Sequence, residues 1–206
     1  MANLPSLDTQ ARIATDAAQD FVNNYYDSLN KRQPLAQYYA SISSHLTSAS
    51  VKPDISINGR VVESVAAYEV LLDAQGANVL YDIASFDTHP VNPNYALGCP
   101  ENLSPAADGS DGGGPGRGKV AKSIKDGDRL SFAVQVSGTI RYGKPGATPA
   151  PAAAKGGNAA AGVEEAPVET AFNESWLLVP HWEALGRNAA RGLKKWVVVS
   201  QNFRAF

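Results

Sequence analysis

Tyrosine, aspartate and histidine are the residues of this sequence that could carry acid–base chemistry. Such chemistry needs a base with an orienting partner within hydrogen-bond reach. The candidates are Tyr25, Tyr26, Tyr38, Tyr39, His45, Tyr68, Tyr81, Asp82 and His89. No spacing among them pairs a base with an orienting group, and strand alternation places Asp82 opposite to Tyr81. We therefore expect amphipathic core-edge tyrosines with hydrogen-bonded hydroxyls, and no catalytic residue.

Metal and cofactor sites have little support. The histidines, His45, His89 and His181, are far apart and lack a ligand spacing such as i, i+4. The lone Cys99 excludes an intramolecular disulfide and a cysteine-rich zinc site. The run from Gly113 to Lys119 has the glycine and lysine positions of a phosphate-binding loop, but Val120 stands where a hydroxyl is needed. We expect no metal and no cofactor.

Two basic stretches are candidates for RNA contact. The first holds Arg117, Lys119, Lys122 and Lys125, and the second holds Arg187, Arg191, Lys194 and Lys195. Flexible basic loops bind phosphates without sequence specificity through counterion release. The alternative is a solvated loop, since acids are present in the first region and the formal net charge is −2. That net charge argues against a general polyanion binder.

The elements that must position these residues follow an α+β order. Helical spacing predicts helices from Asp8 or Thr9 to about Asn30, from Leu35 to about Ile42, and from Ser64 to near Gly76. Asn58-Gly59 predicts a hairpin over residues 54–62. Four strands follow, at 79–91, 130–142, 173–179 and 195–203. Helices early and strands late predict three N-terminal helices packed on one face of a curved antiparallel sheet.

Two long stretches interrupt this pattern, at about 99–128 and 143–168. They are rich in Gly, Ala and Pro and cannot bury enough apolar surface to offset the entropy of ordering them. We expect them to be surface insertions in one domain that spans residues 1–206. The sequence shows no basic and apolar leader and no long apolar run, so we expect an intracellular protein without a membrane segment.

One face of the 130–142 strand is the most informative surface for function. Leu130, Phe132, Val134, Val136 and Ile140 alternate with small polar residues that carry no charge, which is typical of an interface core. The alternative is an exposed sheet rich in Ser and Thr. With the neighbouring strands, the predicted interface comprises Ala133, Gln135, Ser137, Asn173, Ser175, Leu177, Val198 and Asn202.

Several segments resemble the nuclear transport factor 2-like family. They are Phe21-Val-Asn-Asn-Tyr-Tyr-Asp-Ser-Leu29 in the first helix, Ser85-Phe-Asp-Thr-His-Pro-Val91, and the closing Trp196-Val-Val-Val-Ser-Gln-Asn-Phe-Arg204. The resemblance as a whole covers nearly the whole chain outside the insertions and the 183–192 loop. Within the family, the long late loops are similar to those of the fungal small subunit (mRNA transport regulator) of the heterodimeric mRNA export receptor.

This resemblance implies a cone-shaped fold and a non-catalytic subunit that pairs, sheet to sheet, with the large subunit of the receptor. It also implies export of mRNA, and of large ribosomal subunits as a second cargo, with nucleoporins reached through the heterodimer. The expected location is the nucleus, the nuclear pore and the cytoplasm. The family also contains isomerases and dehydratases that use the cone pocket, and such an enzyme is the alternative function.

Overall fold

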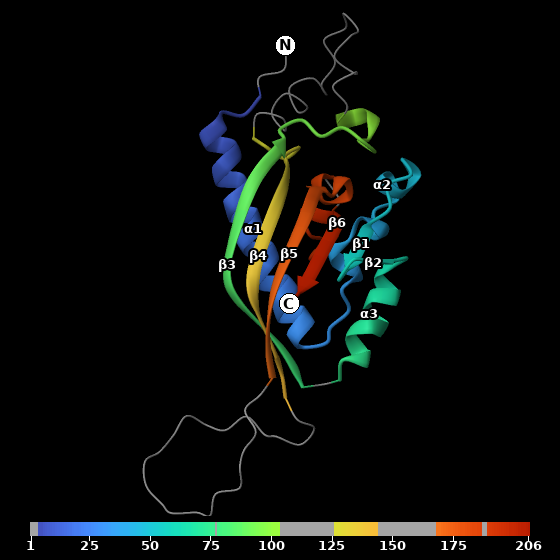
Figure 1. Cartoon of the computed structure of the whole chain (residues 1–206). Coiled ribbons are helices and arrows are strands. Elements are labelled where there is room, and N and C mark those ends of the chain that lie inside the picture. The colour runs from blue at the N-terminus through green and yellow to red at the C-terminus, as the bar shows by residue number, and fades with distance from the viewer. Residues whose placement is uncertain (1–3, 77, 104–125, 144–167, 187–188) are drawn as a thin grey trace, which may run out of the picture.

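The described residues fold as three helices and four short 3₁₀ turns around one curved sheet (Figure 1). This computed structural model describes residues 4–76, 78–103, 126–143, 168–186 and 189–206. Most of both expected insertions, and with them Arg117, Lys119, Lys122, Lys125 and Arg187, lie outside the described residues. At their bases, residues 99–103 and 126–128 are described, and residues 101–103 form a 3₁₀ turn.

Helix α1 (Leu7–Asn30) begins where the Ser6 hydroxyl accepts a hydrogen bond from the Thr9 amide. Its predicted apolar stripe is confirmed, since Ala14, Ala18 and Tyr25 have no exposed surface and Leu29 is 2% exposed. Helix α3 (Val65–Ala74) is capped by Ser64, as its sequence predicts. Both helices therefore present one apolar face to the sheet.

The predicted helix from Leu35 to Ile42 is wrong in detail. Residues 36–38 and 40–42 form two 3₁₀ turns, because Tyr39 between them is extended with φ −112° and ψ 152°. A short helix follows as α2 (Ser44–Ser48). The Glu183 carboxylate holds its start, accepting hydrogen bonds from Ser43 Oγ at 2.7 Å, Ser44 Oγ at 2.8 Å and the His45 amide at 3.1 Å.

The described strands form one six-stranded sheet in the order β2-β1-β6-β5-β4-β3. Their bounds are β1 (Asp54–Ile57), β2 (Arg60–Val62), β3 (Val79–Asn92), β4 (Ser131–Tyr142), β5 (Val168–Pro180) and β6 (Trp196–Ala205). Strands β3 to β6 pair antiparallel, but β1 runs parallel to β6. The sheet is therefore mixed, and its one parallel pair corrects the expected antiparallel sheet.

A β-bulge changes which β6 residues face the core. Leu177 pairs with Ser200 while Leu178 pairs with Val198, so Val199 is an extra residue on β6. On the N-terminal side of the bulge, the alternation of inward and outward side chains along β6 is therefore shifted by one residue. Val198 consequently has no exposed surface and packs in the main core, which corrects its predicted place at the interface.

Candidate partner interface

The outer face of β4, β5 and β6 carries a grid of nine residues that lie opposite the helix-covered face. Side chains two apart on one strand point the same way, and pairing aligns them across the strands. The register gives three rows: Ala133–Leu177–Ser200, Gln135–Ser175–Asn202 and Ser137–Asn173–Arg204. Seven of the predicted interface residues lie in this grid, and Val198 does not. The register adds Ser200 and Arg204, which were not among the predicted residues.

We call these nine residues the outer grid. Its members are exposed or half-buried, and all are uncharged except Arg204 at one corner. The six residues of the second and third rows line a depression of about 410 Å³, and Phe206 lines it with them. The Ser137 hydroxyl and Asn173 Oδ1 lie 2.7 Å apart within it.

Charged groups flank the outer grid along β3 and beyond its Ser137–Asn173–Arg204 row. Arg141 bridges Asp82 and Glu169 at 3.1 and 2.8 Å, and His89 lies 3.2 Å from Asp87 on β3. An uncharged centre within a charged rim is the usual arrangement of a protein–protein interface. The outer grid therefore has the character predicted for a buried partner face.

Directly beneath the outer grid lies a buried polar network that sequence reasoning missed. The Glu174 carboxylate accepts hydrogen bonds from Tyr26 Oη at 2.6 Å and from Gln201 Nε2 at 2.5 Å. Gln201 accepts one from Tyr39 Oη at 2.6 Å, and the Tyr25 and Tyr39 hydroxyls lie 3.0 Å apart. Alternation along β5 was the available signal, because it places Glu174 inward beside Trp176.

Burial controls the ionisation of this network. Glu174 is 2% exposed, and desolvation raises its pKa to about 7, although hydrogen bonds from Tyr26 and Gln201 act in the opposite direction. Burial also raises the pKa of Tyr26, and the neighbouring Glu174 carboxylate adds to that rise. Glu174 is thus a buried carboxyl that can exchange a proton near neutral pH.

An enzyme would need room for a substrate beside that carboxyl. Tyr25 and Tyr39 have no exposed surface, and Tyr26 and Tyr68 are 3% exposed, so aromatic side chains fill the space around Glu174. Asp82 lies outside, paired with Arg141, and His89 is exposed on β3. The predicted hydroxyl hydrogen bonds are present at Tyr25, Tyr26, Tyr38, Tyr39 and Tyr81.

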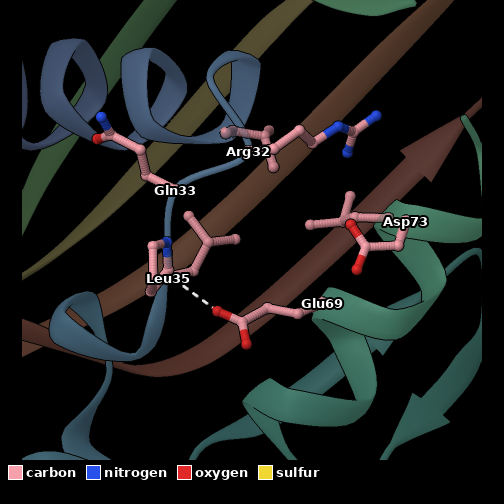
Figure 2. Close-up of a pocket in the computed structure, with 8 residues that line it drawn as sticks. Arg32, Gln33, Leu35, Glu69 and Asp73 are labelled. Carbon is pink, nitrogen blue, oxygen red and sulfur yellow. Dashed lines mark hydrogen bonds between the residues drawn. The ribbon is translucent and has the colours of Figure 1, made fainter. Parts of the chain in front are cut away.

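A separate cavity of about 170 Å³ lies between the end of α1 and helix α3 (Figure 2). Leu29, Leu35 and Leu72 are among its lining residues. Glu69 accepts a hydrogen bond from the Leu35 amide at 2.7 Å, and Arg32 donates to the Gly76 carbonyl at 2.8 Å (Figure 2 shows both side chains). These bonds fix α3 to the segment after α1, which is a structural role.

The second basic stretch is partly engaged within the chain. Lys195 Nζ lies 2.7 Å from Asp128 Oδ1 and 4.8 Å from the centre of the Trp196 ring. Lys194 Nζ lies 5.2 Å from the Tyr38 ring, and Arg191 is exposed. The Lys195–Asp128 pair places this stretch beside residues 126–128, at the C-terminal end of the first insertion.

His181 is buried and stands at the N-cap of the 3₁₀ turn Trp182–Leu185. Its Nδ1 lies 2.8 Å from the Lys194 carbonyl oxygen, and its Nε2 lies 3.3 Å from Glu183. Among the described residues, no three His, Cys, Asp or Glu side chains come together as metal ligands would. In the same part of the chain, no helix is both long and apolar enough to span a bilayer.

No protein-family model matches the sequence, and no curated protein is similar to it. Solved structures do match. A chain of the structure titled "Sac3N peptide bound to Mex67:Mtr2" is 27% identical with a TM-score of 0.72, over 94% of this chain and 99% of that one. A chain of the Chaetomium thermophilum Mex67 NTF2-like domain complexed with Mtr2 is 27% identical with a TM-score of 0.70, over 94% and 98%.

The structure titled "Structure of Mtr2" matches with a TM-score of 0.69 over 94% of this chain and 99% of that one. Its identity of 24% shows the fold alone. The chain has the Mtr2-like form of the nuclear transport factor 2-like fold. The α+β fold and the family resemblance predicted from the sequence are thereby confirmed.

Proposed function

We propose that this chain is the non-catalytic small subunit of a heterodimeric mRNA export receptor and pairs through the outer grid with an NTF2-like domain of the large subunit. The observation that carries the proposal is the uncharged centre of the grid within its charged rim. The matched structures support it, because their titles name complexes of Mtr2 with Mex67 and one names the NTF2-like domain of Mex67.

The size of the grid sets what the partner must cover. Three rows two residues apart span about 13 Å along the strands, and three strands span about 10 Å across them. A stable interface buries about 800 Å² on each partner. The outer grid is therefore the centre of the proposed interface, and the partner must also reach the charged rim on β3 and at Arg141.

A non-catalytic role suits the interior of the cone. The buried hydroxyls and Glu174 satisfy one another, and a substrate would have to displace packed aromatic rings to reach them. This arrangement supports a structural network over an isomerase or dehydratase site. We extend the proposal to one domain over residues 1–206, interrupted by the two insertions.

The proposal includes the contacts that such a receptor makes. The basic stretches at Arg117–Lys125 and Arg187–Lys195 would contact RNA or ribonucleoprotein cargo, and nucleoporins would be reached through the heterodimer. The chain would then shuttle between nucleus, nuclear pore and cytoplasm. Large ribosomal subunits are a second cargo of the same kind.

Co-expression with the NTF2-like domain of a large subunit tests the pairing. The native chain should co-purify with that domain in equal amounts. Ser175→Arg at the centre of the outer grid should abolish co-purification, because burying an uncompensated charge in the interface costs about 3–5 kcal/mol. Asn23→Arg is the matched control, since Asn23 is exposed on α1, which covers the opposite face of the sheet.

Co-purification that survives Ser175→Arg would place the interface elsewhere. Loss of the complex with both variants would instead indicate a general folding defect. A circular dichroism melt of each soluble variant separates these outcomes.

A further inference from the structure

A groove separate from the outer grid lies between α1 and the start of β6. Its volume is about 290 Å³, at the low end for small-ligand sites of about 300–1,000 Å³. Ala17, Asp20, Phe21 and Asn24 of α1 line one wall, Tyr38 lies in it, and residues 193–196 form the other wall. A space of this size suits one planar ring system.

The rings of the groove are held in fixed positions. Trp196 Nε1 donates to the Leu130 carbonyl at 2.9 Å, and the Tyr38 hydroxyl donates to the Asn24 carbonyl at 2.8 Å. Phe21 packs edge-on against Tyr38 with ring centres 6.0 Å apart. Leu193 is 36% exposed at the rim. The aromatic part of the groove is therefore held in one arrangement before any ligand binds, which lowers the cost of binding a ring.

Charge is divided between the two walls. Lys194 lines the β6 wall, and no carboxylate of the described residues lies within ion-pair distance of its ammonium or of the nearby Arg191 guanidinium. Lys195 also lines this wall, but Asp128 already neutralises it. On the opposite wall, Asp20 is an exposed carboxylate without an ion-pair partner among the described residues.

We propose that this groove binds one unpaired base of a single-stranded RNA, while Lys194 and Arg191 hold the adjacent phosphates. Stacking on Trp196 and Leu193 would hold the base, and its edge would face Asp20. A carboxylate only accepts hydrogen bonds, so the groove should prefer a base whose edge presents two N–H donors side by side, which is guanine. This inference rests on the RNA contact proposed above and names the part of the RNA that is recognised.

The cations of the groove favour RNA over an aromatic peptide side chain. Lys194 and Lys195 line one wall, and Arg191 is exposed three residues before Lys194. An aromatic peptide side chain would need the apolar part of the walls but not these cations. Phosphates on both sides of a flipped base would use both features.

Fluorescence anisotropy of the purified heterodimer tests the proposal. The probes are three fluorescein-labelled hexauridylates whose fourth position is replaced by guanosine, by adenosine or by an abasic ribose. We expect the guanosine probe to bind about tenfold tighter than the abasic probe, which is the order of one stacked base. Lys194→Gln should weaken all three probes and lower the salt slope by about 0.7, as for one lost phosphate contact on a single strand.

Two variants separate base recognition from charge. Asp20→Ala should reduce the guanosine-over-adenosine preference. If Asp20 only repels RNA, that variant would bind every probe more tightly with the preference unchanged, and the proposed base contact would be wrong. Lys31→Gln is the matched control for Lys194→Gln, because Lys31 lies about 16 Å further along α1 than Asp20 and pairs with Asp27 at 2.7 Å.

The remaining outcomes are also decisive. Equal affinity for the guanosine and abasic probes would refute base binding in the groove, even if Lys194→Gln weakens RNA binding. Competition by a phenylalanine-containing peptide, without any effect of the base, would assign the groove to a protein ligand instead. A heterodimer that forms but binds no probe would refute both RNA proposals and leave the pairing intact. If no heterodimer forms, the pairing fails, and the same titration on the chain alone still tests the groove.

Discussion

Replacing Glu174 by glutamine should remove most of the pH dependence of folding stability between about pH 5 and pH 8. The carboxyl is 2% exposed and its pKa is about 7 in the folded chain, against an ordinary value of 4.5. The folded state therefore keeps a proton that the unfolded chain releases. Because its pKa is raised, Glu174 stabilises the fold least at high pH: stability falls as pH rises from about 4.5 to about 7 and then levels off.

The magnitude follows from the size of the shift. A difference of about 2.5 pKa units, at 1.36 kcal/mol each, corresponds to a loss of about 3 kcal/mol across this range. Glutamine stays neutral but replaces one hydrogen-bond acceptor by a donor, which costs about 1 kcal/mol. We therefore expect Glu174→Gln to be close to the native chain in stability at pH 5, where part of this loss has already occurred, and about 2 kcal/mol more stable at pH 8.

Urea denaturation followed by tryptophan fluorescence at pH 5, 6, 7 and 8 measures this difference. Subtracting the two proteins at each pH cancels other groups that change charge in the same range. Glu169→Gln is the control on the same strand, since Glu169 is half exposed in its pair with Arg141 and should change stability by less than about 1 kcal/mol at every pH. A native-minus-variant difference that is constant from pH 5 to pH 8 would show that burial does not penalise the Glu174 charge, and the reasoning would be wrong.

Two further predictions concern the scaffold. Gly138→Ala should lower the free energy of unfolding by about 1–3 kcal/mol in urea titrations, because a Cβ there would meet the Asp82 carbonyl oxygen and the Phe172 ring. The neighbouring Thr139→Ala is the control. Equal losses of stability in the two variants would count against a steric clash at Gly138. Glu183→Ala should cost about 2 kcal/mol at pH 7 through the lost bonds to Ser43 and its neighbours. Burial alone would raise the pKa of Glu183, but these hydrogen bonds lower it to about 2. The stability that Glu183 contributes is therefore lost as the pH falls from about 4.5 towards 2. An acid-unfolding curve of Glu183→Ala with the same midpoint as that of the native chain would contradict this.

Much of the fold could be predicted because local patterns agree with the tertiary structure. The α1 stripe, the Asn58-Gly59 hairpin and the alternation of β4 each bury the residues that their periods indicate. Helix α2 could not be predicted, because the carboxylate that holds its start comes from Glu183, more than 130 residues away. Tertiary contacts there override the weak helical preference of residues 35–42.

In the outer grid, too, local patterns predicted some residues, and strand pairing decided others. Strand alternation identified Gln135 and Ser175 correctly as outward-facing, because polar and apolar residues alternate there without a break. Val198 lies in an unbroken run of valines, Val197 to Val199, that suits either face, and only pairing with β5 reveals the bulge. The same alternation could have predicted that Glu174 points inward, but its hydrogen-bond partners Tyr26 and Gln201 come from elements distant in the sequence.

The most direct test of the proposed pairing is isothermal titration of this chain with the NTF2-like domain of a large subunit. We expect one-to-one binding by the native chain and by Asn23→Arg. Gln135→Arg should bind at least a hundredfold more weakly, since a buried unpaired charge costs about 3 kcal/mol or more. Native affinity for Gln135→Arg, with the complex still forming at one to one, would contradict the assignment of the outer grid as the partner interface.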